Sequence, residues 1–449
     1  MNTLVVGKGI SGIDTAQLLI SKGVTPVYFD ISDEAGSYEL YSRFTDPEEV
    51  LIYYGTLPGN VLASIDDVIV ADAIPMDDPV VRQLSVMGFS IRGELEVAAS
   101  YDRGKILAVT GTKGKTSATT LLGKIVKDRT RNEFTVGDDI ASYADLVCST
   151  TKDSTTVVKV TARNLETIKS FHPHVSSIIN IMPSYVARYE SPGEYINVKE
   201  RIMANQTKDD HIILNYDEEY TRRIGLRLDE QGGVRPFFFS TQRELKRGLF
   251  LKGDSIILRD SWGERKLLNA SDLSIVGKHN LENAFTAMAM AYKYGIPTDS
   301  IIRSCMEFSP VAHRVEYVAT KNGVMFYNDS KGTDVDTAIN GIEAMDRPTY
   351  LIGGGNDNGG DYGEWIDSFG GKVRKLVLIG QTRERMANVA KAHGFYDYVY
   401  AEDLEEAVRI CTSHANPGEA ILLSPACETG AYKSFKERGD AFRAIVEKL

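Results

Sequence analysis

The stretch KILAVTGTKGKTSATTLLGKIVKDR, residues 105–129, decides the fold of the chain. Its apolar run from Ile106 to Val109 predicts a buried strand, and apolar positions between Leu121 and Val126 recur at helical spacing. The intervening residues 110–116 are rich in glycine and end in lysine and threonine. Glycines let successive N–H groups point at one phosphate, to which the following helix adds its positive N-terminus. The stretch therefore predicts a phosphate-binding loop between a strand and a helix.

In such a loop Lys115 is expected to reach the β- and γ-phosphates of a nucleotide, and the Thr116 hydroxyl to bind Mg²⁺. The residues expected to contact the nucleotide are Thr110, Gly111, Thr112, Lys113, Gly114, Lys115 and Thr116. The spacing G-x-x-G-K-T is about two residues shorter than the usual pattern, so an ordinary glycine-containing strand–helix turn is the alternative. The order of strand, glycines, lysine, threonine and helix favours the phosphate loop.

The composition excludes several classes of protein. The chain has 449 residues, 43% of them hydrophobic and 25% charged, as expected of a globular protein with about two to four domains. A net charge of −11 argues against nucleic acid as the main partner. No apolar run approaches the about 18–20 residues of a membrane helix, and the start MNTLVVGKGISG lacks a signal-peptide pattern, which predicts a cytoplasmic protein without membrane contact. Cysteines without CxxC spacing, expected to be reduced and mostly buried, are Cys148, Cys305, Cys411 and Cys427.

The N-terminal segment also predicts a strand followed by a glycine-rich turn. Residues 2–7 are an apolar strand, and the turn Gly7-Lys8-Gly9-Ile10-Ser11-Gly12 precedes a helix. A second strand, 26–29, ends at Asp30, where a ribose-binding acid lies in a dinucleotide-binding fold. An NAD-dependent dehydrogenase is therefore an alternative, but no second half of a dinucleotide fold follows. The turn is instead expected to hold a nucleotide diphosphate in a small α/β domain, 1–93.

The rest of the chain alternates strands and helices, which predicts parallel sheets with helices on both faces. The expected strands are 157–160, 177–181, 211–215, 324–328, 349–352, 375–379 and 420–423. A polar insertion with alternating strand character, 232–265, interrupts the central segment, and Gly295-Ile296-Pro297 ends a helix at a domain boundary. The sequence thus predicts a central domain, 94–297, and a C-terminal domain, 298–449.

Five motifs appear in the order and spacing of one family. They are TGTKGKT (110–116), GKHNLENA (277–284), HRVE (313–316), NDSKGT (328–333) and LLSPAC (422–427). In these motifs the chain resembles the Mur ligases over essentially its whole length, and among them the branch that adds D-glutamate. The resemblance implies an α/β fold with a Rossmann-like UDP-binding domain, a central phosphate-loop ATPase domain and a Rossmann-like C-terminal domain. It also implies a monomeric ligase that uses ATP and Mg²⁺ to phosphorylate a UDP-sugar carboxylate, which the amine of an amino acid then attacks.

The resemblance assigns roles to particular residues. Catalytic roles fall to Lys115, Lys199, His313 and Lys331. Contacts with ATP fall to the loop residues and to Asn280, Asn283, Arg314 and Asp329. Contacts with the substrates fall to Gly7, Lys8, Gly9, Ile10, Ser11, Asp30, Asp138, Thr333 and Ser424. Metal binding falls to Thr116 and to Lys199, which stands where the family has a carbamylated lysine for a second Mg²⁺. The structural alternatives are a solvated helix lysine at 199, a helix N-cap at 329 and an interdomain salt-bridge pair at 313–314.

The sequence departs from the family pattern at the expected metal and substrate sites. Lys159, in VKVTARN (158–164), stands where the family has a metal-binding glutamate, and its charge repels Mg²⁺. Further departures are Lys113, Asp138, the loop ADAIP (71–75), Tyr185 in PSYVAR (183–188), Asn358 in NDNG (356–359) and the segment ETGAY (428–432). Two hypotheses follow: an ATP-dependent amide ligase, of the D-glutamate-adding type or with altered substrates, and a nucleotide-binding protein without normal turnover.

Overall fold

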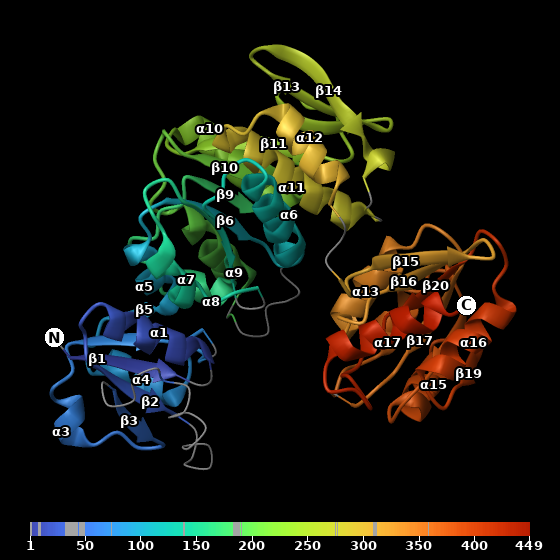
Figure 1. Cartoon of the computed structure of the whole chain (residues 1–449), viewed down its shortest axis with the longest axis horizontal. Helices are drawn as coiled ribbons and strands as arrows, with labels where there is room; N and C mark the ends of the chain where they lie inside the picture. The colour runs from blue at the N-terminus through green and yellow to red at the C-terminus, as the bar shows by residue number, and fades with distance from the viewer. Residues whose placement is uncertain are drawn as a thin grey trace. The chain divides into compact units, whose positions relative to one another are not determined.

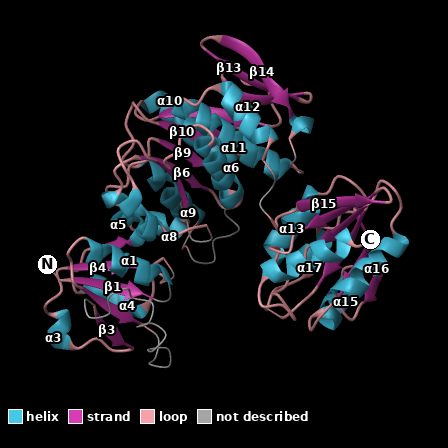
Figure 2. Ribbon diagram, viewed as in Figure 1, coloured by secondary structure: helices cyan, strands magenta, loops and turns pink. Residues whose placement is uncertain are grey.

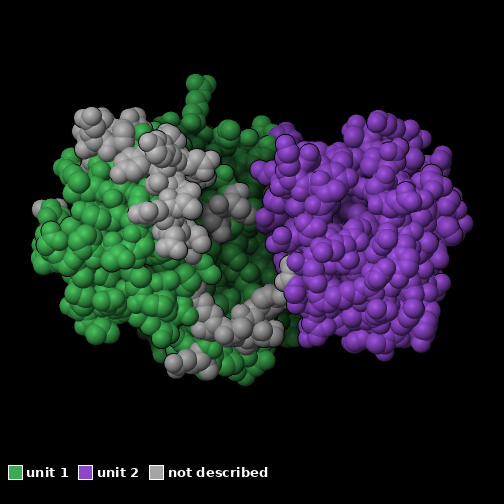
Figure 3. All heavy atoms as spheres, turned by 90° about the horizontal axis from the view of Figure 1, so that it is seen from below, with its two compact units in different colours: residues 1–272, 282–306 green, residues 273–281, 307–449 purple. Residues whose placement is uncertain are grey.

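The computed structural model describes residues 2–7, 10–31, 44, 50–72, 74–137, 140–182, 189, 191–273, 275, 277–308, 312–357 and 359–449, without the side chains of Ile10 and Asp336. Strands in this part of the chain form three sheets flanked by helices, which confirms the α/β class (Figure 1, Figure 2). The chain divides into two compact units, Met1–Asp272 with Glu282–Met306, and Leu273–Leu281 with Glu307–Leu449 (Figure 3). The three domain ranges given above stay predictions.

The first sheet is parallel, with the strand order β3-β2-β1-β4-β5 in its described residues. Its strands are β1 (Thr3–Gly7), β2 (Pro26–Asp30), β3 (Leu51–Tyr54), β4 (Asp67–Val70) and β5 (Ile91–Gly93). The helices of this segment are α1 (Ile10–Ser21), α3 (Gly59–Leu62), α4 (Pro79–Val86) and α5 (Glu94–Tyr101). Every residue of β1, β2 and β4 is buried, as expected for parallel strands covered on both faces. The end of β1 and the end of β4 therefore lie at the same, carboxyl edge of this sheet.

The second sheet has the order β14-β13-β12-β11-β10-β9-β6-β8-β7 in the described chain. Its strands are β6 (Lys105–Thr110), β7 (Glu133–Val136), β8 (Thr155–Lys159), β9 (Val175–Ile178), β10 (His211–Asn215), β11 (Arg235–Ser240), β12 (Gly248–Lys252), β13 (Ser255–Asp260) and β14 (Gly263–Asn269). The pairs from β7 to β12 are parallel, whereas β12, β13 and β14 pair antiparallel. The predicted insertion thus extends the sheet, and β13 and β14 form its outer hairpin (Figure 1).

Helices connect the parallel strands of the second sheet. They are α6 (Lys115–Lys127), α7 (Tyr143–Leu146), α8 (Ala162–Glu166), α9 (Pro192–Glu200) and α10 (Glu219–Gln231), whereas α11 (Lys278–Tyr294) and α12 (Thr298–Met306) follow the last strand, β14. The Ala- and Met-rich stripe of α11 is buried along Ala284–Ala291, so it packs in the core as the sequence predicted. Serine and threonine caps begin several of these helices, and Thr161 forms a full capping box with Asn164 at α8.

The third sheet has the order β15-β16-β20-β17-β18-β19 and belongs to the second compact unit. Its strands are β15 (Glu316–Lys321), β16 (Val324–Asn328), β17 (Thr349–Gly353), β18 (Val373–Leu378), β19 (Tyr398–Tyr400) and β20 (Ala420–Leu423). Its helices are α13 (Val335–Ala344), α14 (Gly363–Asp367), α15 (Arg383–Ala392), α16 (Leu404–His414) and α17 (Phe435–Glu447). Only β15 among these strands pairs antiparallel, with β16. Separate apolar clusters cover the two faces of this sheet, as in a doubly wound fold.

Two expectations from composition can be compared with the structure. All four cysteines are free thiols, and three of them are buried, as predicted. In the part of the chain that the structure describes, no helix has both the length and the apolar character to cross a membrane.

Candidate functional site

The loop predicted to bind phosphate connects β6 to α6 at the carboxyl end of β6. Gly114, which precedes α6, has a φ of 81°, a conformation that glycine adopts without strain. A Cβ on Gly114 would lie 2.0 Å from Asn283 Oδ1, and one on Gly111 would lie 3.2 Å from Ile179 Cβ. A side chain at Gly114 would therefore clash with Asn283, whereas one at Gly111 would need Ile179 to move by a few tenths of an ångström.

Asn180, just beyond β9, holds the loop in place. Its Oδ1 accepts a hydrogen bond from the Lys113 amide at 2.9 Å, and its carbonyl accepts one from the Thr112 amide at 3.1 Å. Lys115 Nζ donates to the carbonyl oxygens of Gly111 and Thr112, at 2.9 and 2.8 Å. The lysine expected to reach the phosphates thus lies against the backbone of its own loop.

Lys199, on α9, is buried beside this loop. Its side chain is 1% exposed, and Nζ donates to Thr110 Oγ1 and to the Gly111 carbonyl, both at 3.1 Å. Burial, and secondarily the charge of Lys115, lower the pKa of Lys199 well below its ordinary value. The alternative of a solvated helix lysine is therefore wrong. The Gly111 carbonyl accepts from both lysines, which brings the two Nζ atoms together at the carboxyl end of β6.

Asn283 belongs to this loop site, because it contacts Gly114 and is only 6% exposed. Thr116 is half-buried in the first turn of α6. Asn280 lies on the part of α11 that belongs to the other compact unit and is half-buried there.

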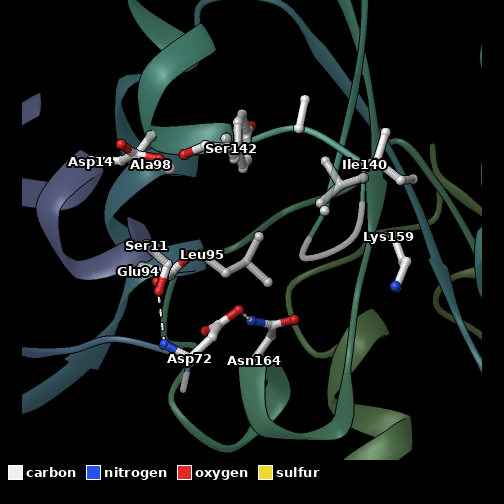
Figure 4. A pocket seen from close by; sticks show the side chains of 15 residues that line it. Ser11, Asp14, Asp72, Glu94, Leu95, Ala98, Ile140, Ser142, Lys159 and Asn164 are labelled. Carbon is white, nitrogen blue, oxygen red and sulfur yellow. Dashed lines mark hydrogen bonds between the residues drawn. The ribbon is translucent and has the colours of Figure 1, made fainter. Parts of the chain in front are cut away.

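A cavity of about 290 Å³ lies between residues of the first and second sheets (Figure 4). Its polar lining includes the carboxylates of Asp14, Asp72 and Glu94 and the ammonium of Lys159. Burial raises the pKa of Asp14, an effect opposed by a hydrogen bond with Ser142. The sequence patterns gave no reason to select Asp14 or Glu94, because the residues next to them in the sequence do not show that they lie near residues far along the chain.

Several departures from the family pattern line this same cavity. Asn164 Nδ2 donates a short hydrogen bond to Asp72 Oδ2, and the Asp72 amide donates to Glu94 Oε2 at 3.2 Å (Figure 4). Arg163 Nη1 also donates to the Asp72 carbonyl, at 3.4 Å. These contacts tie the residue after β4 to the beginning of α8. Figure 4 shows Lys159 across the cavity from Ser11 and Glu94.

Lys159 is the last residue of β8 and is 7% exposed. It lies directly beside Val109 of β6, one residue before the phosphate loop begins at Thr110. A Cβ on Gly137 would lie 2.6 Å from Lys159 Cβ, so the position before Asp138 must remain glycine. Within the described residues, no group of three or more His, Cys, Asp or Glu side chains is arranged to hold a metal ion. A lysine side chain at the end of β8 offers no oxygen ligand to a divalent cation.

Two residues of the glycine turn predicted after β1, Gly7 and Ser11, lie in the described part of the chain. A Cβ on Gly7 would lie 2.5 Å from the Tyr28 hydroxyl oxygen, which requires glycine there. Ser11 lines the cavity, and Asp30 is buried at the end of β2. Predicted positions outside the described residues are Lys8, Gly9, Ala73, Asp138, residues 183–188 including Tyr185, Asn358 and the side chain of Ile10.

In the second unit, His313 is buried in a polar cluster and has a φ of 66°. Its amide donates to Glu316 Oε2 at 2.9 Å, and Asn328 Nδ2 lies 3.0 Å from His313 Nδ1. The Ser330 amide donates to Asn328 Oδ1 at 3.2 Å, which fixes the amide so that Nδ2 faces the imidazole. Asn328 Nδ2 also donates to Glu316 Oε2 at 3.1 Å and to the Gly439 carbonyl at 3.2 Å. Burial lowers the pKa of His313, which favours the neutral ring.

Asp329 is fully enclosed beside this histidine segment. Its carboxylate accepts hydrogen bonds from the Val315 amide at 3.1 Å and from Ser424 Oγ at 2.7 Å. Burial raises the pKa of Asp329 to about 7, and these two hydrogen bonds oppose the rise. A Cβ on Gly341 would approach Asp329 Oδ2 to 2.5 Å. The N-cap of α13 is Asp334, so the alternative that Asp329 caps a helix is wrong.

The remaining predicted residues surround this cluster. The Lys331 amide donates to the His313 carbonyl at 3.0 Å, and Lys331 Nζ lies 4.1 Å from the centroid of the Phe435 ring. The Thr333 amide donates to the Lys331 carbonyl at 2.8 Å, and Arg314 is half-buried. Ser424 is fully buried with its hydroxyl on Asp329, so it positions that carboxylate and has no exposed surface for a substrate.

Arg438, on α17, is a buried residue that the sequence patterns did not select. Its guanidinium donates to Ser330 Oγ at 3.0 Å, to the Ser330 carbonyl at 2.9 Å and to the Glu428 carbonyl at 2.9 Å. Burial lowers the pKa of Arg438 to about 10. The side chain thereby joins the loops that follow β16 and β20. Its only signal in the sequence is a cation on a face of α17 that otherwise includes apolar Phe442 and Val446.

The parallel sheets and the loop between β6 and α6 define an α/β protein of the phosphate-loop type. Comparison with known families then identifies its kind. The family model for the Mur ligase middle domain matches residues 109–291, and the model for the Mur ligase glutamate ligase domain matches residues 313–427. The chain belongs to the Mur ligase family.

Curated relatives cover nearly all of the chain. It is 41% identical over 447 residues to UDP-N-acetylmuramoylalanine–D-glutamate ligase from Lachnoclostridium phytofermentans, across 99% of this chain and 98% of that protein. It is 39% identical to the ligase of the same name from Lachnospira eligens, with the same coverage.

Solved structures of low sequence identity share the fold. A pseudomurein peptide ligase type C from Methanothermus fervidus matches with a TM-score of 0.59 and 15% identity, covering 100% of this chain and 99% of that one. UDP-N-acetylmuramate-alanine ligase from Thermotoga maritima matches with a TM-score of 0.59 and 16% identity, at the same coverage. The three-domain Mur ligase architecture expected from the sequence is therefore confirmed.

Proposed function

We propose that the chain is a cytoplasmic, ATP-dependent amide ligase that adds D-glutamate to UDP-N-acetylmuramoyl-L-alanine in peptidoglycan precursor synthesis. Relatives that match over 98% of their own length have this name. The observation that supports the proposal most directly is the phosphate loop on which Lys115 and Lys199 converge. The cofactors are ATP and Mg²⁺, and the partners are a UDP-sugar and an amino acid, with no nucleic acid or membrane. The enzyme acts as a monomer.

The loop fits the phosphates of ATP. Gly114 leaves no room for a side chain, so phosphate oxygens are expected to approach the backbone there, while the Thr112 and Lys113 N–H groups donate to Asn180. The thirteen-residue helix α6 directs its positive N-terminus at the same point, and the Lys115 ammonium adds a full charge. Thr116 offers a hydroxyl for one Mg²⁺, which when bound would offset the charge of the transferred phosphoryl group.

The reaction needs charge neutralisation and positioning more than covalent help from the protein. An oxygen of the acceptor carboxylate attacks the γ-phosphorus, the bond to the β–γ bridging oxygen breaks, and ADP leaves. The amine of D-glutamate then attacks the acyl carbon, phosphate departs with its bonding electrons, and the nitrogen loses a proton. Lys115 and the N-terminus of α6 stabilise the negative charge that moves during the first step.

Lys199 suits the carbamylated role that the family resemblance implies. Its lowered pKa favours the unprotonated amine. That amine attacks CO₂, a nitrogen–carbon bond forms, and a proton is released, which leaves a carbamate. The product is a buried carboxylate-like group beside the phosphate loop. In the described surroundings it would offset the nearby charge of Lys115.

In the second unit, we infer that Arg314 and Lys331 act on phosphate groups and that Thr333 contacts the amino acid. Asp329 positions this segment, because it accepts hydrogen bonds from Val315 and Ser424. His313 supports the same segment as a ring whose Nδ1 lies 3.0 Å from Asn328 Nδ2.

A second candidate function is nucleotide binding without normal turnover. It is favoured by Lys159, a buried cation at the end of β8 where the family has a metal-binding glutamate. Losing a metal ligand and adding a positive charge lowers a phosphoryl-transfer rate by on the order of a thousandfold. In this alternative the chain binds ATP or a UDP-sugar on an intact scaffold.

Phosphate release from ATP and Mg²⁺, with UDP-N-acetylmuramoyl-L-alanine and D-glutamate, separates the two functions. Release that requires both substrates supports the ligase. If the wild type releases no phosphate and Lys159→Glu releases some, the result supports the second candidate function. The control is Lys208→Glu, the same charge change at an exposed position outside the cavity. If neither the wild type nor any variant releases phosphate although ATP still binds, the result contradicts the proposed substrates.

A further inference from the structure

A basic cavity lies at the amino ends of β10 and β11. Its volume is about 290 Å³, and its lining includes His211, the first residue of β10, and Arg235, the first residue of β11. The two residues are directly paired across the parallel strands. Because β6, β9 and β10 are parallel, the phosphate loop lies at the opposite edge of the same sheet. The cavity is therefore separate from the candidate site described above.

Positive charge dominates this cavity. Arg235, Arg247 and Lys293 line it against a single carboxylate, Asp229. Arg235 and Arg247 are exposed, and the charge of Arg247 opposes the effect of burial, which raises the pKa of Asp229. Burial lowers the pKa of Lys293, and the charges of Arg247 and Arg235 lower it further. A chain with a net charge of −11 thus concentrates mutually repelling cations at one place.

His211 adds an unsatisfied polar atom to the same lining. Its Nδ1 is buried and has no hydrogen-bond partner in the described part of the chain. Buried polar atoms nearly always have a partner, so this nitrogen is an exception in the described structure. The pKa of His211 falls to about 4 through burial first and then through the charges of Lys293, Arg235 and Arg247. An anion would relieve the repulsion among Arg235, Arg247 and Lys293 and would favour the charged form of His211.

The loop after α10 keeps the mouth of the cavity free of side chains. Gly232 and Gly233 line it with φ angles of 73° and 110°. A Cβ at either position would meet no atom within 4 Å, so packing does not explain the glycines. Their conformation instead leaves the backbone of this loop accessible beside the cations.

We propose that this cavity binds the phosphate group of inorganic phosphate or of a small phosphorylated metabolite. Arginine matches phosphate oxygens with two parallel N–H donors, and Lys293 supplies a compact third charge. The volume exceeds that of one phosphate ion and is near the lower end for small-ligand sites, about 300 Å³. This inference does not depend on the proposed ligase activity.

The test follows the ¹³Cε1 NMR signal of His211 in the full-length protein during titration with inorganic phosphate in a chloride buffer. The signal is assigned by its loss in His211→Gln. We expect a saturable change at millimolar phosphate and an upward movement of the His211 pKa from about 4, because an anion favours the charged ring. Arg247→Gln should weaken phosphate binding about tenfold or more. The matched control is Lys246→Gln, an exposed neighbour outside the cavity, which should retain wild-type affinity.

Two further probes distinguish the source of the phosphate. Equal affinity for inorganic phosphate and glycerol phosphate indicates the free ion, whereas tighter binding of the ester indicates a metabolite, and both support the site. Arg235→Gln gives a second loss-of-binding variant. The proposal is overturned if His211 does not respond to either probe at tens of millimolar, or if Arg247→Gln and Lys246→Gln weaken binding equally.

Discussion

Asp329→Asn should remove a large part of the pH dependence of stability in the C-terminal unit. The carboxyl group is completely buried, and its pKa rises from the ordinary 3.8 to about 7. A rise of about three pH units corresponds to about 4 kcal/mol in the free energy of unfolding. The folded state holds this proton up to about pH 7, whereas the unfolded chain releases it near pH 4. Stability from this group is therefore complete below the unfolded pKa and is lost as the pH rises through 7.

Asparagine is the appropriate replacement because it is nearly isosteric and never ionises. The Val315 amide can still donate to its Oδ1, and the new Nδ2 can donate to Ser424 Oγ after the hydroxyl turns. The variant should thus lose the proton linkage without opening a cavity. Above pH 7 we expect it to be more stable than the wild type, because it avoids a buried charge.

The assay is urea unfolding of the two proteins at several pH values between about 4.5 and 8, read from tryptophan fluorescence. Trp365 is buried in the C-terminal unit, so a Trp262→Phe background makes it the only reporter. The difference between wild type and variant should change by about 3 kcal/mol across this range, because part of the total lies below pH 4.5. Asp403→Asn is the control, since it changes the exposed N-cap carboxylate of α16 to another good N-cap residue. Parallel pH profiles for the wild type and Asp329→Asn would refute the reasoning.

Three other predictions concern the phosphate loop and its cavity. Gly114→Ala should lower the free energy of unfolding by about 1–3 kcal/mol in thermal unfolding and should abolish ATP binding. The reasons are the positive φ of Gly114 and its contact with Asn283. The control Gly59→Ala, at a position with open space around it, should have neither effect. A ¹³C-bicarbonate NMR experiment should show a carbamate signal in the wild type that is absent from Lys199→Met, and its presence in both would contradict the assignment. Lys159→Glu should increase Mn²⁺ binding in the presence of a non-hydrolysable ATP analogue, measured by electron paramagnetic resonance, and unchanged binding would reject a blocked metal site.

The order of elements was predictable because parallel strands buried on both faces are continuous apolar runs. The strands 211–215, 324–328 and 420–423 coincide with β10, β16 and β20. The strand expected at 177–181 instead spans Val175–Ile178, although Ile179 and Ile181 are also buried. Apolar character reports burial, and hydrogen bonding decides where a strand ends, so a pattern of side chains misplaces such a boundary.

Local chemistry made the phosphate loop predictable, whereas contacts between distant segments were not. Lys115 lies in a contiguous motif, and its hydrogen bonds join residues within four positions of it. Arg438 reaches Ser330 from 108 positions away, and Glu94 meets Asp72 only because β4 and β5 are neighbours. No pattern in a single sequence shows that such distant residues are in contact.

The departures from the family pattern around the cavity are physically coupled. Asp72, Lys159 and Asn164 are separated in the chain but line one cavity, and Asp72 and Asn164 are hydrogen-bonded to each other. Replacing either partner alone leaves a polar group without its hydrogen bond, so the energetic effects of the two positions cannot be additive. If the site had lost its function and its residues had then changed independently, a hydrogen-bonded pair such as Asp72 and Asn164 would not be expected. The paired contacts therefore favour an acceptor site that changed as a unit, beside a phosphate loop whose glycines and lysine keep their geometry. For the same reason, Lys159→Glu alone should restore only part of any lost metal-dependent activity, because the hydrogen bonds of Asp72 would still shape the cavity.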